Sequence, residues 1–557
     1  MNLIIFLAFY HLAYFSGRGI YLFVIKKSDT NTTSKEFIEG VNIEIFYPIF
    51  SLFFIGNCLV LINFFSSLKT AFPVIGLILI LTLLGNFKVK YNIKNLKIWL
   101  IQHNLFPIIL SVTLYGSWFH FDTGAYHLNY QNLLRTEKIS LGAANLNFGY
   151  GFSSILEYLE AILWYPDNFV FIFFINLIFY VLLFSFLLNS IYSGSTYLKV
   201  SSTFLILFGF LDNFGFLGGA NGFFQVQAIA KPDMPFGITF IIISQLFISK
   251  IQHSSYSYRD IKLLSIATVF LVQIKLLGLY IGLLIIYYLY QFNKNTKLEI
   301  RKLFAEIKIS IALFLIWIFK NFLISGCFLF PLKYTCIKRA DWFIDGYLNS
   351  YIYDTKISQR AYFTGSNISE WFESFISKGF NLQILINFFC FIIFIFLFRS
   401  IFFIKENSAD MQKVLAIINI IFISTWLLSS PVPRWGAHIY PFIVITLGVG
   451  LKFKNEYLSK KLFVNSMYAF FILTAALFPR MYSYQSLFDE RGGLYKLSSP
   501  KVEYVLNTSK TGYIVDYNLY QPQQCWINKD CLLSDKAVTF KTIRGYLVYL
   551  PDGSVKW

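Results

Sequence analysis

Long apolar runs recur along most of the chain, separated by short polar segments. As helices, runs of about 17 to 25 residues can cross a hydrocarbon core about 30 Å thick. We expect such helices near residues 3–25, 43–65, 70–86, 98–119, 168–189, 198–216, 234–250, 303–325, 381–398, 413–429, 437–451 and 462–479. The run 262–291 is long enough for a hairpin of two short helices, bent at Gln273-Ile274-Lys275. The pattern predicts an all-α polytopic membrane protein with about 12 to 14 transmembrane helices.

The composition supports this class. The 557 residues are 56% hydrophobic and only 14% charged, which excludes an ordinary soluble domain. The net charge of +18 could suit nucleic acid, but the positive residues lie mostly in short loops between apolar runs. We therefore expect the lipid bilayer as a partner and no nucleic acid. The chain has no P-loop and no dinucleotide fingerprint, which argues against a cytosolic enzyme that uses nucleotide sugars.

Lys and Arg are unevenly distributed between alternate loops. By the positive-inside rule, the set rich in these residues is cytoplasmic. This set comprises residues 26–42, 87–97, 190–199, 250–262, 292–302, 399–413 and 452–461. Loops 120–167 and 326–380 and the tail then lie on the outer, extracytoplasmic face. The first apolar run lacks a basic start, so we interpret it as an anchor in a multi-pass plasma-membrane protein, not as a cleavable signal peptide.

The tail differs in character from the rest of the chain. Short segments at 512–515 and 545–549 read as strands, with a turn at Pro551-Asp552-Gly553. We expect a small outer domain of β or α/β structure over 481–557. The main transmembrane module would span 98–480, and 1–97 would hold additional N-terminal helices.

Four of the six cysteines form two close pairs on the predicted outer face. Cys327 and Cys336 lie in one loop, and Cys525 and Cys531 lie in the tail. This oxidising side favours two disulfides, although a chance placement of four thiols also accounts for the pattern.

Ionisable residues follow the fourth apolar run at Asp122 and His127. Beyond them, 124–135 and 153–164 have the amphipathic pattern of helices that lie in a membrane interface. These helices would cover the position where Asp122 leaves the membrane. For Glu157 and Glu160, in the second helix, we favour solvated positions over a functional role.

Cations are expected at the outer ends of other apolar runs. An unpaired charge there is costly unless it reaches the surface or has a function. Arg434 is the first choice for binding a phosphate, because its guanidinium can make two-point contact. Lys275, at the hairpin bend, is the next candidate, whereas Lys231 and Lys320 could equally extend to the surface.

The remaining polar candidates allow several roles. His127 could orient Asp122, contact a phosphate or cap the interface, and His120 and His438 are similarly ambiguous. Asp233 is a candidate second acid. No His, Cys and Asp set has the spacing of metal ligands, so no cofactor is certain and a divalent metal stays open.

Several short motifs follow one another along the chain. They are Asp122 with Tyr126-His127; Gly142 to Phe152-Ser153-Ser154; Lys231-Pro232-Asp233; Lys320-Asn321 with Ser325-Gly326-Cys327 and Pro331; Pro431-Val432-Pro433-Arg434-Trp435; and, in the tail, Gln524-Cys525-Trp526, Cys531 and Arg544-Gly545. Their order resembles that in the polytopic C-type (GT-C) glycosyltransferases, and more closely that in a largely uncharacterised group of bacterial membrane proteins. The resemblance runs from about residue 98 to the end. In the usual C-type enzyme the acidic loop follows the first helix, whereas three expected helices precede it here.

The resemblance implies transfer of a sugar from a polyprenyl-phosphate donor to a glycan, lipid or protein acceptor on the outer face. Asp122 would be the general base, with His127 beside it. Tyr126, Lys231, Asp233, Lys275, Lys320, Arg434 and His438 would bind substrate. A surface-polysaccharide polymerase or ligase is the alternative, and a transporter is a weaker one because no repeated half is present.

Overall fold

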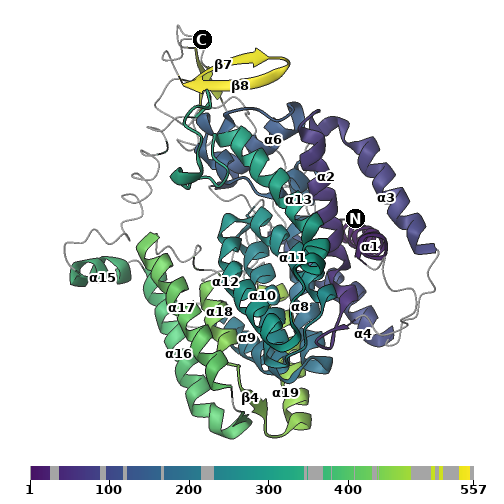
Figure 1. The fold of residues 1–557 in the computed structure, drawn as a ribbon, viewed down its shortest axis with the longest axis vertical. Coiled ribbons are helices and arrows are strands. Elements are labelled where there is room, and N and C mark those ends of the chain that lie inside the picture. The colour runs from purple at the N-terminus through teal and green to yellow at the C-terminus, as the bar shows by residue number, and fades with distance from the viewer. Residues whose placement is uncertain are drawn as a thin grey trace.

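The structure is a computed structural model. It describes residues 2–25, 37–87, 96–116, 122–164, 169–214, 231–343, 348, 368–377, 379–406, 408–429, 436, 438–477, 504–508, 514–518 and 538–551. Among these residues the chain is mostly helical, with small separate two-stranded sheets (Figure 1). The expected all-α architecture is therefore present.

Most of the helices coincide with the apolar runs. The helices of the described residues are α1 (Asn2–Ile20), α2 (Tyr47–Asn63), α3 (Phe72–Phe87), α4 (Leu96–Leu100), α5 (Phe106–Leu110), α6 (Leu128–Thr136), α7 (Ile155–Ala161), α8 (Phe173–Ser193), α9 (Thr196–Phe214), α10 (Asp233–Gln252), α11 (Tyr258–Ile274), α12 (Gly282–Thr296), α13 (Ile300–Ser325), α15 (Ile368–Ile376), α16 (Gly379–Phe402), α17 (Ala409–Ser429), α18 (Ile439–Thr446) and α19 (Glu456–Leu477). Helices α6, α7 and α15 lie instead in the loops between the apolar runs. Eight helical segments of the described residues are long and apolar enough to cross a membrane. This agrees with a multi-pass membrane protein.

Burial separates central helices from peripheral ones. In the apolar spans that contain α8 and α10, 94% and 100% of the residues are buried. In those of α12, α13 and α17, only 28% of the residues are buried. A helix that is apolar on all sides must be covered by protein or by lipid. The centre of the bundle is thus formed by α8 and α10, and the peripheral helices leave apolar side chains for lipid to cover.

The hairpin predicted within 262–291 is present. α11 ends at Ile274, and Lys275 follows in extended conformation before the short 3-10 helix η11 (Leu276–Ile281) and α12. Tyr258, at the start of α11, packs against Phe292 near the end of α12, with ring centroids 5.3 Å apart. The chain therefore reverses at the predicted bend.

The N-terminal helix α2 packs against the main body through α7, α8 and α13. Asn57 of α2 and Gln273 of α11 exchange two amide hydrogen bonds, of 3.1 and 2.8 Å, inside the bundle. Buried amides need such partners, since an unpaired one costs free energy. α2 is therefore fixed to the core, while the predicted domain boundary near residue 97 stays a prediction.

The strands form antiparallel pairs. β1 (Phe37–Ile38) pairs with β2 (Val41–Asn42), β3 (Phe403–Lys405) with β4 (Leu451–Phe453), β5 (Tyr504–Thr508) with β6 (Ile514–Asn518), and β7 (Val538–Ile543) with β8 (Tyr546–Pro551). The strands expected near 512–515 and 545–549 are thus present. β7 and β8 join through Arg544 and Gly545, which both have positive φ. Pro551 of the expected Pro551-Asp552-Gly553 turn ends β8, whereas Asp552, Gly553 and the pair Cys525 and Cys531 lie outside the described residues.

Candidate functional site

Residues 122–164, which we call the roof, cover one end of the helix bundle, at the top of Figure 1. The roof begins with a π-helical turn, η6 (Thr123–His127), that continues into α6, and it ends with α7. Helices were expected in both places. They are not half-exposed, however: in α6, Asn129 and Gln131 are as buried as Leu128. The roof is therefore packed inside protein on nearly all sides.

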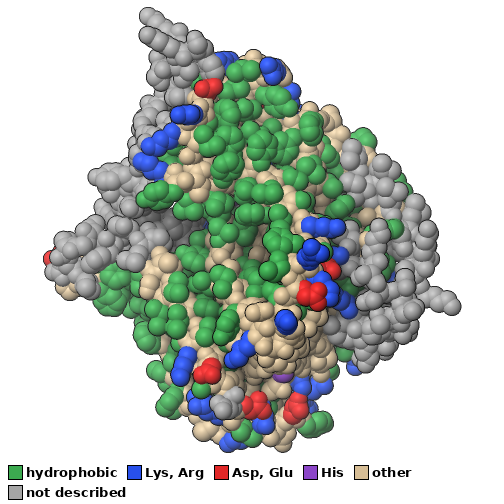
Figure 2. Space-filling model, in the orientation of Figure 1, with side chains coloured by type: hydrophobic (Ala, Val, Ile, Leu, Met, Phe, Trp, Pro, Cys, Tyr) green, Lys and Arg blue, Asp and Glu red, His purple; other side chains and the backbone are tan. Residues whose placement is uncertain are grey.

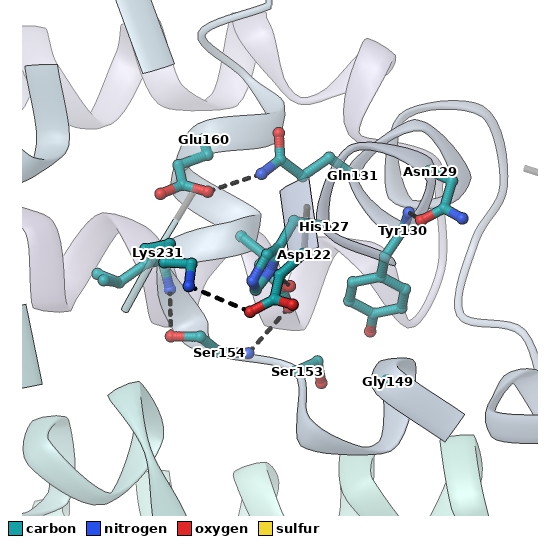
Figure 3. Close-up of polar contacts among 12 residues, drawn as sticks. Asp122, His127, Asn129, Tyr130, Gln131, Gly149, Ser153, Ser154, Glu160 and Lys231 are labelled. Atoms are coloured by element: carbon teal, nitrogen blue, oxygen red, sulfur yellow. Dashed lines mark hydrogen bonds and ion pairs between the residues drawn. The ribbon is translucent and has the colours of Figure 1, made fainter. Parts of the chain in front are cut away.

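The roof brings Asp122 to a residue far along the chain. Lys231 Nζ lies 3.2 Å from Asp122 Oδ2. In Figure 3 the Lys231 side chain reaches toward the Asp122 carboxylate. Only 13% of the Asp122 side chain and 9% of the Lys231 side chain are exposed, so the two charges neutralise each other in a largely dry setting.

A second ion pair adjoins the first. Pro232 separates Lys231 from Asp233, which lies in the first turn of α10, where the helix dipole favours an acid. Asp233 Oδ1 lies 2.5 Å from Nζ of Lys275, at the hairpin bend. Four charged residues from three parts of the chain thus meet at one end of the bundle. We call Asp122, Lys231, Asp233 and Lys275 the charge row.

His127 is held by a residue that the sequence interpretation placed in solvent. Its Nδ1 lies 2.7 Å from Glu157 Oε1, and the two side chains are 5% and 3% exposed. The other oxygen of Glu157 accepts a hydrogen bond from the backbone N–H of Ser154, which completes a capping box at the start of α7. The expectation of a solvated Glu157 is wrong because α7 packs its acidic face against α6.

Glu160 is buried as well, contrary to expectation. Gln131 Nε2 donates a hydrogen bond of 2.6 Å to Glu160 Oε2, and Trp164 donates to the Gln131 carbonyl oxygen at 2.7 Å. Figure 3 shows Glu160 and Gln131 pointing toward one another. Burial, and then the neighbouring charge of Glu157, raise the pKa of Glu160 well above its usual range. Glu157 and Glu160 therefore differ in their environments although they lie one turn apart.

Lys320 belongs to this interior and not to the charge row. Its side chain is fully buried, its Nζ donates a 2.6 Å hydrogen bond to Ser153, and the ammonium lies 3.6 Å from the Trp317 ring centroid. Full burial rules out the alternative that it extends to the surface. His127, Gln131, Ser153, Glu157, Glu160 and Lys320 together form what we call the buried network.

Of the remaining candidate residues from the sequence, His438 and Tyr126 are described by the structure and both pack against other side chains. His438 is 1% exposed and packs among the rings of Phe236, Phe240, Tyr280 and Phe422. Neither of its ring nitrogens has a hydrogen-bond partner among the described residues. Tyr126 packs so closely on Gly149 that a Cβ there would lie 2.6 Å from its ring. Arg434, the first choice for a phosphate, and His120 lie outside the described residues.

Sequence reasoning did not assign roles to Gln131, Ser153, Glu157 and Glu160. One signal was readable, because Ser154 and Glu157 have the spacing of a capping box, which anchors the acid to the backbone. The partners of the other three lie on separate segments, so no local pattern reveals them. No group of three metal-ligating side chains occurs among the described residues.

Comparison with known proteins identifies a family. A family model described as a domain of unknown function (DUF8201) matches residues 1–441, and the chain belongs to this family. The matched region contains the charge row and the buried network, and it ends before the tail strands. No curated protein and no solved structure matches the chain.

Proposed function

We propose that this member of the DUF8201 family is a glycosyltransferase of the C-type class. It would transfer a sugar from a polyprenyl-phosphate donor to a glycan, lipid or protein acceptor. The charge row carries the proposal, because it places two carboxylates and two ammonium groups together at one end of a membrane-type helix bundle. We assign this end to the extracytoplasmic face of a bacterial plasma membrane, in line with the Lys and Arg distribution.

The reaction needs a base and a site for a leaving phosphate. The acceptor hydroxyl attacks the anomeric carbon of the donor, and its proton passes to the Asp122 carboxylate. The bond between the anomeric carbon and the phosphate oxygen breaks, and the phosphate departs with the electron pair. Attack opposite the leaving group inverts the anomeric carbon. Ammonium groups aimed at the departing oxygens stabilise the charge that develops there.

The ion pairs suggest how the charge row serves both needs. Without substrate, Lys231 neutralises Asp122 and Lys275 neutralises Asp233. A bound phosphate would compete with the carboxylates for these ammonium groups, and it would thereby release Asp122 to accept a proton. Substrate binding and activation of the base are then coupled through Lys231.

His127 has a supporting role in this proposal. The Nδ1 atom of His127 donates a hydrogen bond to Glu157, which fixes the orientation of the imidazole ring. Nε2 is then the second polar atom of the ring. His127 lies one π-helical turn after Asp122 on the same segment. The buried network therefore holds the segment that presents Asp122.

The test uses the purified full chain in lipid nanodiscs with a panel of polyprenyl-phosphate hexoses and pentoses. Asp122→Asn should lower transfer by about 10² to 10⁴-fold, the usual contribution of a general base, while donor binding persists. Glu137→Gln, which removes a roof acid outside the charge row, is the matched control. Unchanged transfer by Asp122→Asn would remove Asp122 from the mechanism, and failure to bind any lipid-linked sugar would reject the class.

A further inference from the structure

The loop after α13 is closed by a disulfide and folds back on the helix. Cys327 and Cys336 are cross-linked, which confirms one of the two predicted disulfides. Ile337 N–H donates to the Gly326 carbonyl at 2.9 Å, and Trp342 Nε1 donates to the Phe322 carbonyl at 3.1 Å. Because residues 326–343 return to the last turn of α13, the loop stays at the level of the helix end.

The outer side of this loop combines apolar and basic side chains. Leu332, Tyr334 and Ile337 are 47%, 102% and 39% exposed. Lys333, Lys338 and Arg339 are also exposed, and Asp341 is the one acid among residues 328–343. Figure 2 shows Lys and Arg side chains gathered along the upper left edge of the molecule, next to a broad apolar surface. We call residues 332–339 the basic loop.

The position of the basic loop relates it to the membrane. α13 is one of the candidate spans, and it exposes Leu315 and Phe319 on its outer side, at 53% and 48%. If lipid covers these side chains, hydrocarbon gives way to headgroups near Ser325, where α13 ends. The basic loop therefore lies at headgroup level, where aromatic side chains are enriched and Lys and Arg side chains near a helix end reach the interface.

We propose that the basic loop binds anionic phospholipid headgroups at this end of the bundle. Lys333, Lys338 and Arg339 contact headgroup phosphates, while Tyr334 and its apolar neighbours enter the interface. A Lys or Arg near an anionic membrane surface contributes about 1 kcal/mol. The disulfide and the return to α13 hold the loop in place, which reduces the entropy lost on binding.

Binding at the basic loop would also anchor the roof. Phe330, just before the loop, packs against Phe152 of the roof with ring centroids 5.0 Å apart. A Cβ on Gly151 would lie 2.6 Å from the Phe330 ring, so the two segments are in close contact. The lipid contact thus continues directly into the segment that carries Asp122. This anchoring does not depend on the glycosyltransferase proposal.

Hydrogen exchange read by mass spectrometry tests the proposal locally. The full chain is placed in nanodiscs of phosphatidylcholine alone or with phosphatidylglycerol added. In wild type, exchange in peptides that cover 328–343 should slow by about fivefold or more when the anionic lipid is present, the factor expected for one cation at such a surface. The triple variant Lys333→Gln, Lys338→Gln and Arg339→Gln should lose this slowing.

Two controls separate the sources of protection. Arg544→Gln removes an exposed cation of the β7–β8 turn, at the same end of the molecule, and should leave loop exchange as in wild type. Glycerol phosphate is added to phosphatidylcholine nanodiscs as a soluble headgroup. Equal exchange in the two lipid compositions would overturn the proposal, and so would protection by glycerol phosphate alone.

Discussion

The charge row and the buried network lie at the same end of the bundle but have different chemical settings. In the charge row, Lys275 is 21% exposed and each charge is paired with a side chain of opposite sign. In the buried network, His127 and Glu157 are 5% and 3% exposed and Glu157 is also fixed to the backbone. An ion pair can exchange its partner for a substrate, whereas a buried network of hydrogen bonds resists change. The comparison suggests that the charge row carries the chemistry and the network holds it in place.

Removal of Lys231 should have the largest effect on activity and so distinguish the charge row from the buried network most clearly. Lys231→Met removes an ammonium group from the leaving phosphate and the partner of Asp122. We expect kcat to fall by about 10² to 10³-fold, as for the loss of one group that stabilises a developing negative charge. Lys231→Arg, which keeps the charge, should retain more activity. Steady-state kinetics measure both effects, and an unchanged kcat for Lys231→Met would place the chemistry elsewhere.

Truncation of Glu157 should affect folding instead. Glu157→Ala leaves His127 and the Ser154 N–H without their buried partner, and we expect a loss of about 3 kcal/mol. This is the low end of the range for removal of one partner from a buried ion pair. Thermal unfolding in nanodiscs, with the isosteric Glu157→Gln as comparison, measures the loss. Wild-type unfolding of Glu157→Ala would show that the network does not stabilise the roof.

Glu160 makes the buried network sensitive to pH. Its raised folded-state pKa means that the folded protein keeps a proton which the unfolded chain releases near pH 4.3. Stability is therefore lost as pH rises from there toward the folded pKa, at about 1.4 kcal/mol per pH unit. Glu160→Gln cannot ionise and should lose this dependence. Unfolding temperatures at pH 5 and pH 7 test the prediction, and parallel changes in wild type and variant would contradict it.

The sequence predicted the fold largely through its apolar runs. The bend at Lys275 interrupts such a run with two polar residues, and the reversal lies there in the structure. The Cys327–Cys336 disulfide was predictable because both residues lie in one short loop. These features depend on neighbours in the sequence, where periodicity and spacing are informative.

The site depends on contacts between distant segments. The alternation of loops predicted that Asp122, Lys231 and Lys275 lie at the same end of the bundle. It did not predict which charges pair with each other. Glu157 and Glu160 looked like the polar face of a half-exposed helix, because the sequence does not show that α2 and α6 cover α7. The same sequence pattern is compatible with a solvated helix face and with a buried network. Only the tertiary packing shows which of the two is present.

The β7–β8 hairpin provides the mildest test of the comparison, because it contacts the roof at Lys138 and Leu141, which belong to neither the charge row nor the buried network. Leu141 exchanges backbone hydrogen bonds of 2.9 Å with Leu547 and Tyr549, and Lys138 Nζ lies 3.9 Å from the Tyr546 ring centroid. Lys138→Met should weaken docking by about 0.5 to 1 kcal/mol, the usual contribution of a cation over an aromatic ring. Hydrogen exchange in the hairpin should rise slightly while kcat stays unchanged. A fall in kcat as large as that of Lys231→Met would instead show that the roof and the charge row act as one unit.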